Sequence, residues 1–396
     1  MRARTGAEVL ISLGLNAAEQ REFHEVLAGS HSTDVVVRVL SLNRAYLADV
    51  TGQLFDGQVN IDADADITRT CTLSLRDPGR SLLWDTSSPN DAALFVDRLV
   101  QIIYVVRAPY PSVKSWSVPI FTGPVTKVSR TADIINLEAS GMEHLISPPT
   151  VAWFAKTYGK GMKKTTLVRL LLSELGGETK FSIPDWAETT AAPVTTVFNS
   201  NLWAVAKRVV GSRAVNHLFY DGRGVCVLRK TPSASVFAFR TGTGGTIISE
   251  PQVSYDMSTV ANTVRVVGAT PAKAKRPVVG TASAPRTHPL SSAALGRNGK
   301  PRVILAELAD DHLKTTAQAT SLARAHLETI LRESVEVTFD AMVIPHLEPE
   351  DVYTVNTPTL GFNGRLKKMT IPLKGGPMTV GYNARRSANK ARIRAR

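Results

Sequence analysis

Cysteine is scarce in this sequence, with two residues among 396, Cys71 and Cys226. Two distant cysteines do not make a disulfide framework or a cysteine-based zinc site, and synthesis in a reducing cytoplasm is expected. Long apolar runs are also missing: no stretch of eighteen apolar residues occurs, so we expect no membrane insertion. Arg2 and Arg4 begin the chain like a secretory signal, but Glu8 interrupts the apolar stretch that follows, so secretion is not expected.

Signatures of catalysis are missing as well. The eight histidines form no His-Glu-x-x-His pair, and no cysteine–histidine cluster has the spacing of a zinc site. The sequence contains no Gly-x-Ser-x-Gly elbow and no phosphate-binding loop with glycine before its Lys-Thr pair. It therefore assigns no catalytic residue, no metal ligand and no cofactor, and enzymatic activity is not expected.

Positive charge is in excess in two places only. The formal net charge is +13, and seven cations without any acid lie between residues 271 and 302. Six more, again without an acid, lie between residues 383 and 396. These thirteen equal the whole excess, so the rest of the chain is neutral and does not indicate a DNA-binding body. The six tail residues are candidates for docking a partner: Arg385, Arg386, Lys390, Arg392, Arg394 and Arg396.

One short stretch, Val59–Leu75, reads VNIDADADITRTCTLSL and carries Asp62, Asp64 and Asp66 at alternate positions. A calcium loop beginning at Asp62 would need glycine at its sixth position and glutamate at its twelfth, where this sequence has isoleucine and leucine. The apolar residues fill the odd positions, which is the period-two pattern of a β-structure with one buried face. We therefore expect β-structure, with a turn or bulge near the Asp-Ala repeat because the run is too long for one strand.

Arg69 breaks this alternation, because it falls on the apolar face of the stretch. Two explanations are open. Either its side chain reaches water at the edge of the sheet, or it pairs with a carboxylate at a contact surface.

The wider chain alternates between a β-rich region, helical segments and a second β-rich region. After a polar, helical N-terminal segment, strands are expected at residues 34–40, 98–106, 116–130 and 133–140. Helices are expected at 163–177, at 200–211 with Ser200 as the N-cap, and at 315–332. Residues 217–229 read as a hairpin that turns at Asp221-Gly222. Strands return at 335–343 and continue to 378–384.

These elements predict an α+β fold that is mainly β, with small α/β insertions and a long loop rich in proline and basic residues. The expected parts are an N-terminal segment (1–33), a first β-domain (34–148), an α/β insertion (149–250), a second β-domain (251–382) and a basic tail (383–396). Within the second β-domain, residues 271–302 are expected to form a mobile loop. Gly123–Ser129 and Gly364–Thr370 share the pattern Gly-x-aliphatic-x-Lys-apolar-hydroxyl, which suggests that the two β-domains are related.

Several motifs, taken in order, resemble the tail hub proteins of long-tailed phages, especially minor tail proteins of phages that infect actinobacteria. They are DGQVNIDADADITRTCTLSLRDP, FTGPVTKVSR with INLEASGMEHLI, SNLWAVAKRVVGSRAVNHLFYDGRGVCVLR, and VIPHLEPEDVYTV with GRLKKMTIPLKGGPMTVGY. The resemblance covers most of residues 34–382. One departure is Glu350, in the turn before Asp351, where the family pattern would have glycine.

The resemblance implies two barrel-like β-domains and a homotrimer whose six barrels form a ring at the virion tail tip. Such a ring would join the tail tube and distal tail protein to the other tail-tip proteins and surround the end of the tape measure protein. DNA would pass through it transiently at most. A ring interface would give Arg69 and the Asp62, Asp64 and Asp66 face an inter-subunit use, and a solvated face is the alternative.

Two other functions are open at this point. The basic loop and tail could make the chain a nucleic-acid-binding protein, with about six phosphates neutralised by the tail. A tail-associated cell-wall hydrolase is the third hypothesis, although the sequence assigns no residue to that activity.

Overall fold

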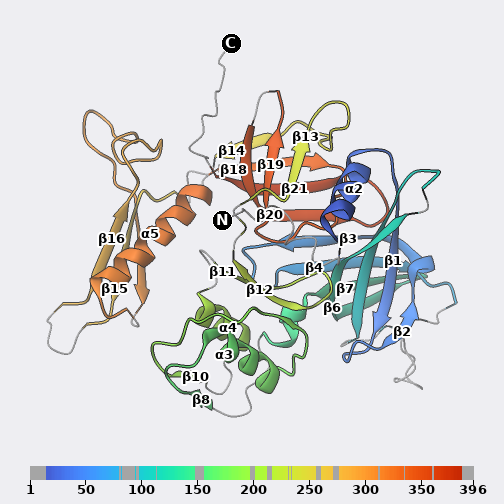
Figure 1. Cartoon of the computed structure of the whole chain (residues 1–396), viewed down its shortest axis with the longest axis horizontal. Coiled ribbons are helices and arrows are strands. Elements are labelled where there is room, and N and C mark those ends of the chain that lie inside the picture. Colours follow the sequence, from blue (N-terminus) through green and yellow to red (C-terminus); the bar gives the residue numbers. More distant parts are fainter. Residues whose placement is uncertain are drawn as a thin grey trace. The chain divides into compact units, whose positions relative to one another are not determined.

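The structure is a computed structural model that describes residues 15–385 except 80–81, 83–93, 95–97, 113, 148–155, 197–200, 212–215, 231, 233, 256–259, 271–275, 311–312, 334 and 359–360. The chain divides into two compact units. Unit 1 comprises residues 1–250, 339–381 and 392–396, and unit 2 comprises residues 251–338 and 382–391. Strands in mainly antiparallel sheets outnumber the small helices, so the prediction of a mainly β, α+β fold is confirmed (Figure 1). No helix among the described residues is long and apolar enough to cross a membrane.

Unit 1 opens with helix α2, Ala17–Ala28, within the segment predicted to be helical. Asn16 caps the helix, accepting from the amides of Ala18 and Glu19, while the Glu19 carboxylate accepts from the Asn16 amide. This reciprocal capping box satisfies amides that the first helical turn leaves without partners.

A single large sheet contains the β-strands from both ends of the chain. In unit 1 its order is β2-β1-β5-β6-β7-β4-β3-β20, after which β20 pairs with β21 and β19, and β19 with β13. The bounds are β1 Ser32–Leu40, β2 Tyr46–Asp49, β3 Leu54–Asp62, β4 Arg69–Arg76, β5 Leu99–Arg107, β6 Ser115–Thr131, β7 Ile134–Ser140, β13 Phe237–Arg240, β19 Val352–Asn356, β20 Gly361–Pro372 and β21 Met378–Arg385, with the 3-10 turns η2 Thr51–Gln53 and η3 Met142–Leu145.

Strands β3 and β20 join the two regions that the sequence predicts as separate β-domains. Five residue pairs, from Lys368 opposite Asp62 to Pro372 opposite Gln58, form this antiparallel ladder. The two β-rich regions are therefore hydrogen-bonded into one sheet within unit 1.

The two echoed motifs occupy corresponding places in this sheet. Strand β6 pairs with β5 up to Pro124 and with β7 from Val125 onward, so it changes partner just after Gly123. Strand β20 pairs with β19 up to Arg365 and with β3 from Lys368 onward, so it changes partner just after Gly364. Each long strand follows a hairpin partner and then passes to a second strand, which supports a relationship between the two regions.

The α/β segment of unit 1 carries the helices predicted from the Leu-rich and Trp-containing motifs. Helix α4 is capped by Asn201, whose side chain accepts from the Ala204 amide, so the prediction of Ser200 as N-cap was wrong by one residue. The predicted hairpin at Asp221-Gly222 is confirmed as β11 and β12. The bounds are β8 Lys156–Tyr158, α3 Lys164–Leu170, the π-helical turn η4 Leu171–Leu175, β9 Phe181–Ser182, β10 Val194–Thr196, α4 Leu202–Val210, β11 Asn216–Tyr220 and β12 Cys226–Lys230.

Unit 2 packs one helix against a three-stranded sheet ordered β16-β15-β17 (Figure 1). The helix, predicted at 315–332, is confirmed as α5. The Pro-rich segment was predicted to be a loop, which is wrong at β16: Gly280 there lies so close to Ala319 and Thr320 of α5 that a Cβ would stand 2.2 Å from their backbone. The bounds are β14 Gln252–Tyr255, β15 Thr263–Gly268, β16 Val279–Ser283, β17 Leu305–Asp310, α5 Thr316–Glu333 and β18 Val335–Ala341.

Candidate functional site

The alternating stretch Val59–Leu75 forms β3, a turn and β4, as its period predicts. The odd-numbered apolar residues of the two strands are buried: Val59, Ile61, Cys71, Leu73 and Leu75 are all 3% exposed or less. Cys71 is a buried free thiol, as its position on the apolar face indicates. Residues 63–68 lie outside the strands, which confirms the expected turn.

The three aspartates of this stretch have different surroundings. Asp62 ends β3, and its carboxylate accepts from the Asp64 amide at 3.0 Å. Asp64 and Asp66 are exposed and belong to the turn predicted near the Asp-Ala repeat, so they lie outside both strands. Asp64 pairs with Lys367 at 2.8 Å, and Asp66 lies 3.7 Å from the ammonium of Lys207.

The turn also contacts helix α4. The indole Nε1 of Trp203 donates to the Asp66 carbonyl at 3.1 Å, and the Lys207 ammonium lies 5.4 Å from the centre of the Trp203 ring. Because Trp203 is itself fully buried, this contact attaches the β3–β4 turn to the core of the α/β segment.

Arg69 begins β4 and is the charged residue on the buried face. Its side chain is 3% exposed, so the explanation that it reaches water at the sheet edge was wrong. One guanidinium nitrogen donates to the Tyr220 carbonyl at 2.5 Å, and the other donates to Glu348 at 2.5 Å. The carboxylate partner that the sequence suggested lies within the same chain. A contact of Arg69 with another subunit stays a prediction.

Three carboxylates, those of Glu143, Glu348 and Asp351, lie near Arg69 inside the fold. Burial raises the pKa of Glu143, Glu348 and Asp351, and the nearby guanidinium groups oppose each rise. Asp351 is fully buried and pairs with Arg229 at 2.7 Å, while its other oxygen accepts from the Glu348 amide at 2.8 Å. Glu348 and Asp351 are thus each paired with a guanidinium group held inside the fold, whereas Glu143 lies near Arg69 without an ion pair of its own among the described residues.

A fourth carboxylate, that of Glu350, lies between the cationic side chains of Lys367 and Arg365. Glu350 has a backbone φ of +64°, in the left-handed region that favours glycine. Its carboxylate lies 2.6 Å from Lys367, 3.5 Å from Arg365 and 3.9 Å from His217. Burial alone would raise the pKa of Glu350, but Lys367, His217 and Arg365 together hold it below its usual value. Glu350 therefore adopts a strained backbone conformation at a place where Lys367 and Arg365 surround its charge.

His217 of β11 faces this carboxylate and is mostly buried. Burial lowers its pKa to about 4; Glu350 opposes this shift, and the neighbouring cations Arg229, Arg365 and Lys367 add to it. At neutral pH the imidazole is therefore uncharged, and Glu350 is balanced by lysine and arginine rather than by histidine.

These buried and half-buried charged residues, together with His217, form one cluster whose members come from three predicted parts of the chain. Arg69 and Glu143 come from the first β-domain, His217 and Arg229 from the α/β insertion, and the remaining five from the second β-domain: Glu348, Glu350, Asp351, Arg365 and Lys367. The sequence singled out Arg69 by its broken phase, and it marked Glu350 only as a departure from the pattern of the proteins it resembles, without assigning it to a site. Glu143 and His217 carry no comparable signal, because their partners lie far away in the sequence.

Most of the basic C-terminal tail lies outside the described residues. Arg385 is the last residue of β21, and the other five tail residues named above lie outside the described residues. Their partner-docking role stays a prediction.

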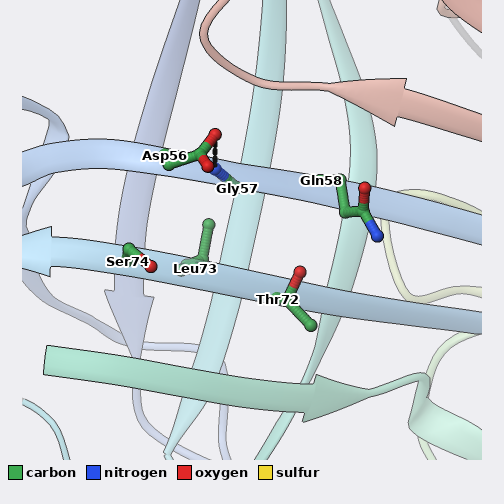
Figure 2. A pocket seen from close by; sticks show the side chains of 6 residues that line it. All are labelled: Asp56, Gly57, Gln58, Thr72, Leu73 and Ser74. Atoms are coloured by element: carbon green, nitrogen blue, oxygen red, sulfur yellow. Dashed lines mark hydrogen bonds between the residues drawn. The ribbon is translucent and has the colours of Figure 1, made fainter.

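A shallow hollow of about 120 Å³ lies over β3 and β4 (Figure 2). Gly57 belongs to its lining and packs closely against β4, since a Cβ there would stand 2.7 Å from the Thr72 carbonyl oxygen. Asp56 is the one charged residue of its lining, and its carboxylate accepts from the Gly57 amide at 2.8 Å (Figure 2). The hollow is a gap in the sheet surface, separate from the place where the buried charges converge.

No protein-family model matches the chain, and no curated protein matches its sequence. Solved structures do match its fold. The 43 kDa tail protein of prophage MuSo2 from Shewanella oneidensis aligns with a TM-score of 0.61 and 9% identity, over 89% of this chain and 98% of that chain. The tail protein from Neisseria meningitidis MC58 aligns with a TM-score of 0.60 and 9% identity, over 89% of this chain and 97% of that chain. Prophage tail protein gp18 from Listeria monocytogenes EGD-e aligns with a TM-score of 0.52 and 10% identity, over 88% of this chain and 94% of that chain.

The chain has the fold of these tail proteins. The match extends over nearly the full length of each, so it includes both β-rich regions and the segment between them. At identities of 10% or less, this likeness establishes the fold alone.

Replacing Arg69 by methionine should destabilise unit 1 by about 3–5 kcal/mol, because Glu348 and Glu143 would remain buried without their cation. Adding Glu348→Gln to Arg69→Met should recover part of that loss, since it removes one of the stranded charges. Urea unfolding followed by tryptophan fluorescence measures both. Lys127→Met is the matched control, because its pair with Glu138 is exposed and should contribute less than about 1 kcal/mol. A loss below about 1 kcal/mol for Arg69→Met would contradict the structural importance of this pair.

The stability conferred by His217 should decrease as pH falls from about 6.5 to about 4. In that window the unfolded chain binds a proton at this histidine and the folded chain does not, so acid favours unfolding. The stability advantage of the wild type over His217→Gln should therefore shrink by about 2.5 kcal/mol between about pH 7.5 and about pH 4.5. His144→Gln, which removes an imidazole from an exposed position, is measured in parallel as the matched control. A pH-independent difference for His217→Gln would show that the imidazole is not held neutral.

Proposed function

We propose that the chain is a non-enzymatic structural protein of a phage tail. The observation that carries this proposal is the full-length fold match to three tail proteins from different bacteria. The internal arrangement of charge agrees with it, because the densest group of ionisable residues is buried and paired within the chain. Such groups stabilise a framework and offer no open cleft for a substrate.

The finer proposal is a tail hub. In it, three copies form a ring at the tail tip that joins the tail tube and distal tail protein to the other tip proteins. The ring surrounds the end of the tape measure protein. The two related β-rich regions support it, because three copies would supply six similar β-regions, which suits a six-fold tube. The host belongs to the actinobacteria in this proposal, which rests on the sequence resemblance.

The surface of unit 1 offers a place for contact between copies. Strand β2 lies at the end of the sheet order, and its outer edge pairs with no described strand. Tyr46 and Leu47 of β2 are 61% and 42% exposed, and Leu42 in the adjoining turn is 47% exposed. Unpaired edges with large apolar side chains are typical of surfaces that bind another chain. The exposed Asp64 and Asp66 are a second, charged candidate for inter-subunit contact.

Mass photometry of the purified chain should show a species of about three times the 42.8 kDa monomer mass. The double variant Tyr46→Asp/Leu47→Asp should shift the population toward monomer, because it places charge on the apolar edge. Tyr110→Asp is the matched control at a 96% exposed position away from this edge, and should leave the trimer unchanged. A strict monomer at high protein concentration would contradict the hub. Equal effects of the two variants would contradict the β2 contact.

A further inference from the structure

The segment between β16 and β17 of unit 2 is held in a defined shape by Asn262, which is 1% exposed. The Asn262 side chain donates to the Arg302 carbonyl at 2.8 Å and accepts from the Ile304 amide at 2.9 Å. Its backbone carbonyl accepts from the Ala284 amide at 2.8 Å. Both ends of the segment are thereby attached to one buried residue.

The interior of the segment is also hydrogen-bonded. The hydroxyl of Ser291, which is 1% exposed, donates to the Arg286 carbonyl at 3.2 Å, and the Arg302 amide donates to the Ser292 carbonyl at 2.9 Å. Arg297 and Lys300 exchange backbone hydrogen bonds of 3.0 and 3.1 Å across Asn298-Gly299. Both central residues have positive φ, 53° and 74°, as in the tight hairpin turn that an Asn-Gly pair favours.

This ordered segment, residues 284–302, carries four exposed cations and is called the basic knob below: Arg286, Arg297, Lys300 and Arg302. No acidic residue occurs between positions 271 and 306. Among the described residues, none of the four cations forms an ion pair. Some exposed cations of unit 1 are paired, since Lys114, Lys127 and Lys163 each lie within 2.9 Å of a carboxylate. What distinguishes the knob is that four cations occur in one short segment that contains no acidic residue.

The remaining surface of the knob restricts what those charges could bind. No phenylalanine, tyrosine or tryptophan occurs between residues 276 and 302, and no large apolar side chain there is exposed, although the exposed Val303 and Leu305 follow directly. Protein-binding surfaces usually present aromatic or large apolar anchors, and single-stranded nucleic acid is usually held by stacking on aromatic rings. Unpaired guanidinium and ammonium groups on a preformed support suit phosphate contacts, which need charge and donors only.

We propose that the basic knob binds the phosphate backbone of double-stranded DNA without reading its sequence. The four cations would each replace counterions at a phosphate, and the hydrogen-bonded knob would lose little conformational freedom on binding. This inference goes beyond the structural role proposed above and rests on the charges of one segment. It would stand if the chain proved not to belong to a tail.

The test measures binding of the full chain to a fluorescein-labelled duplex of about 25 base pairs across a range of salt concentrations. Replacing all four knob cations by alanine should weaken binding at least tenfold at about 100 mM salt and make the slope of log affinity against log salt shallower by about 3–4. Lys300→Ala alone should reduce the slope by about 1, which keeps the test valid if the quadruple variant folds poorly. Unchanged affinity and slope in both variants would overturn the proposal.

Three controls separate phosphate binding from other causes. Replacing Arg107, Lys114, Lys127 and Lys163 by alanine removes the same amount of charge from paired positions, and should change the affinity for DNA little. A loss of affinity equal to that of the knob variant would mean that net charge alone attracts DNA. Val303→Ser, at a 60% exposed apolar position beside the knob, should bind DNA normally, and a loss equal to that of the knob variant would overturn the proposal. Poly-glutamate at equal charge should compete poorly; equal competition would indicate an acidic protein partner instead. The mass of each variant, measured in parallel, tests the ring separately.

Discussion

The ion pair between Arg69 and Glu348 is the contact on which the arrangement of unit 1 depends. A guanidinium that is 3% exposed is costly to bury, and it is stable there only because a carboxylate and a backbone carbonyl take its hydrogen bonds. Those partners come from the turn before β19 and from β11. The requirement to satisfy one buried charge thus fixes three distant segments relative to each other within unit 1.

Glu350 shows how the same region accommodates a residue that its backbone disfavours. Glycine would adopt the left-handed conformation at no steric cost, but it would leave Lys367 and Arg365 without their shared carboxylate. Lys367 in turn bridges Glu350 and Asp64, so the exposed turn between β3 and β4 is connected to the buried charges. The ion pairs of Glu350 offset the strain of its left-handed backbone, and they form only when the whole cluster is assembled.

Much of the fold follows from local sequence. The period-two pattern identified β3 and β4, the glycines after Leu175 and Val210 marked helix ends, and Asp221-Gly222 gave a hairpin. The same rules failed at β16, because proline and small residues on both sides of it read as a loop while the strand is stabilised by α5 packing on Gly280. For the site, the broken phase of Arg69 indicated a carboxylate partner but not which one, since Glu348 is 279 positions away and no local rule reaches that far.

The buried charges couple the β-strands to the α/β segment within unit 1, and hydrogen exchange measures this coupling directly. In Arg69→Met, amide exchange should accelerate at least tenfold, about 1.4 kcal/mol, in residues 141–147, 220–226 and 348–351 together. Residues 263–268 of unit 2 should keep the wild-type exchange rate. Acceleration confined to residues 68–70 would contradict the claim, because it would show that the three segments are held in place without the buried guanidinium.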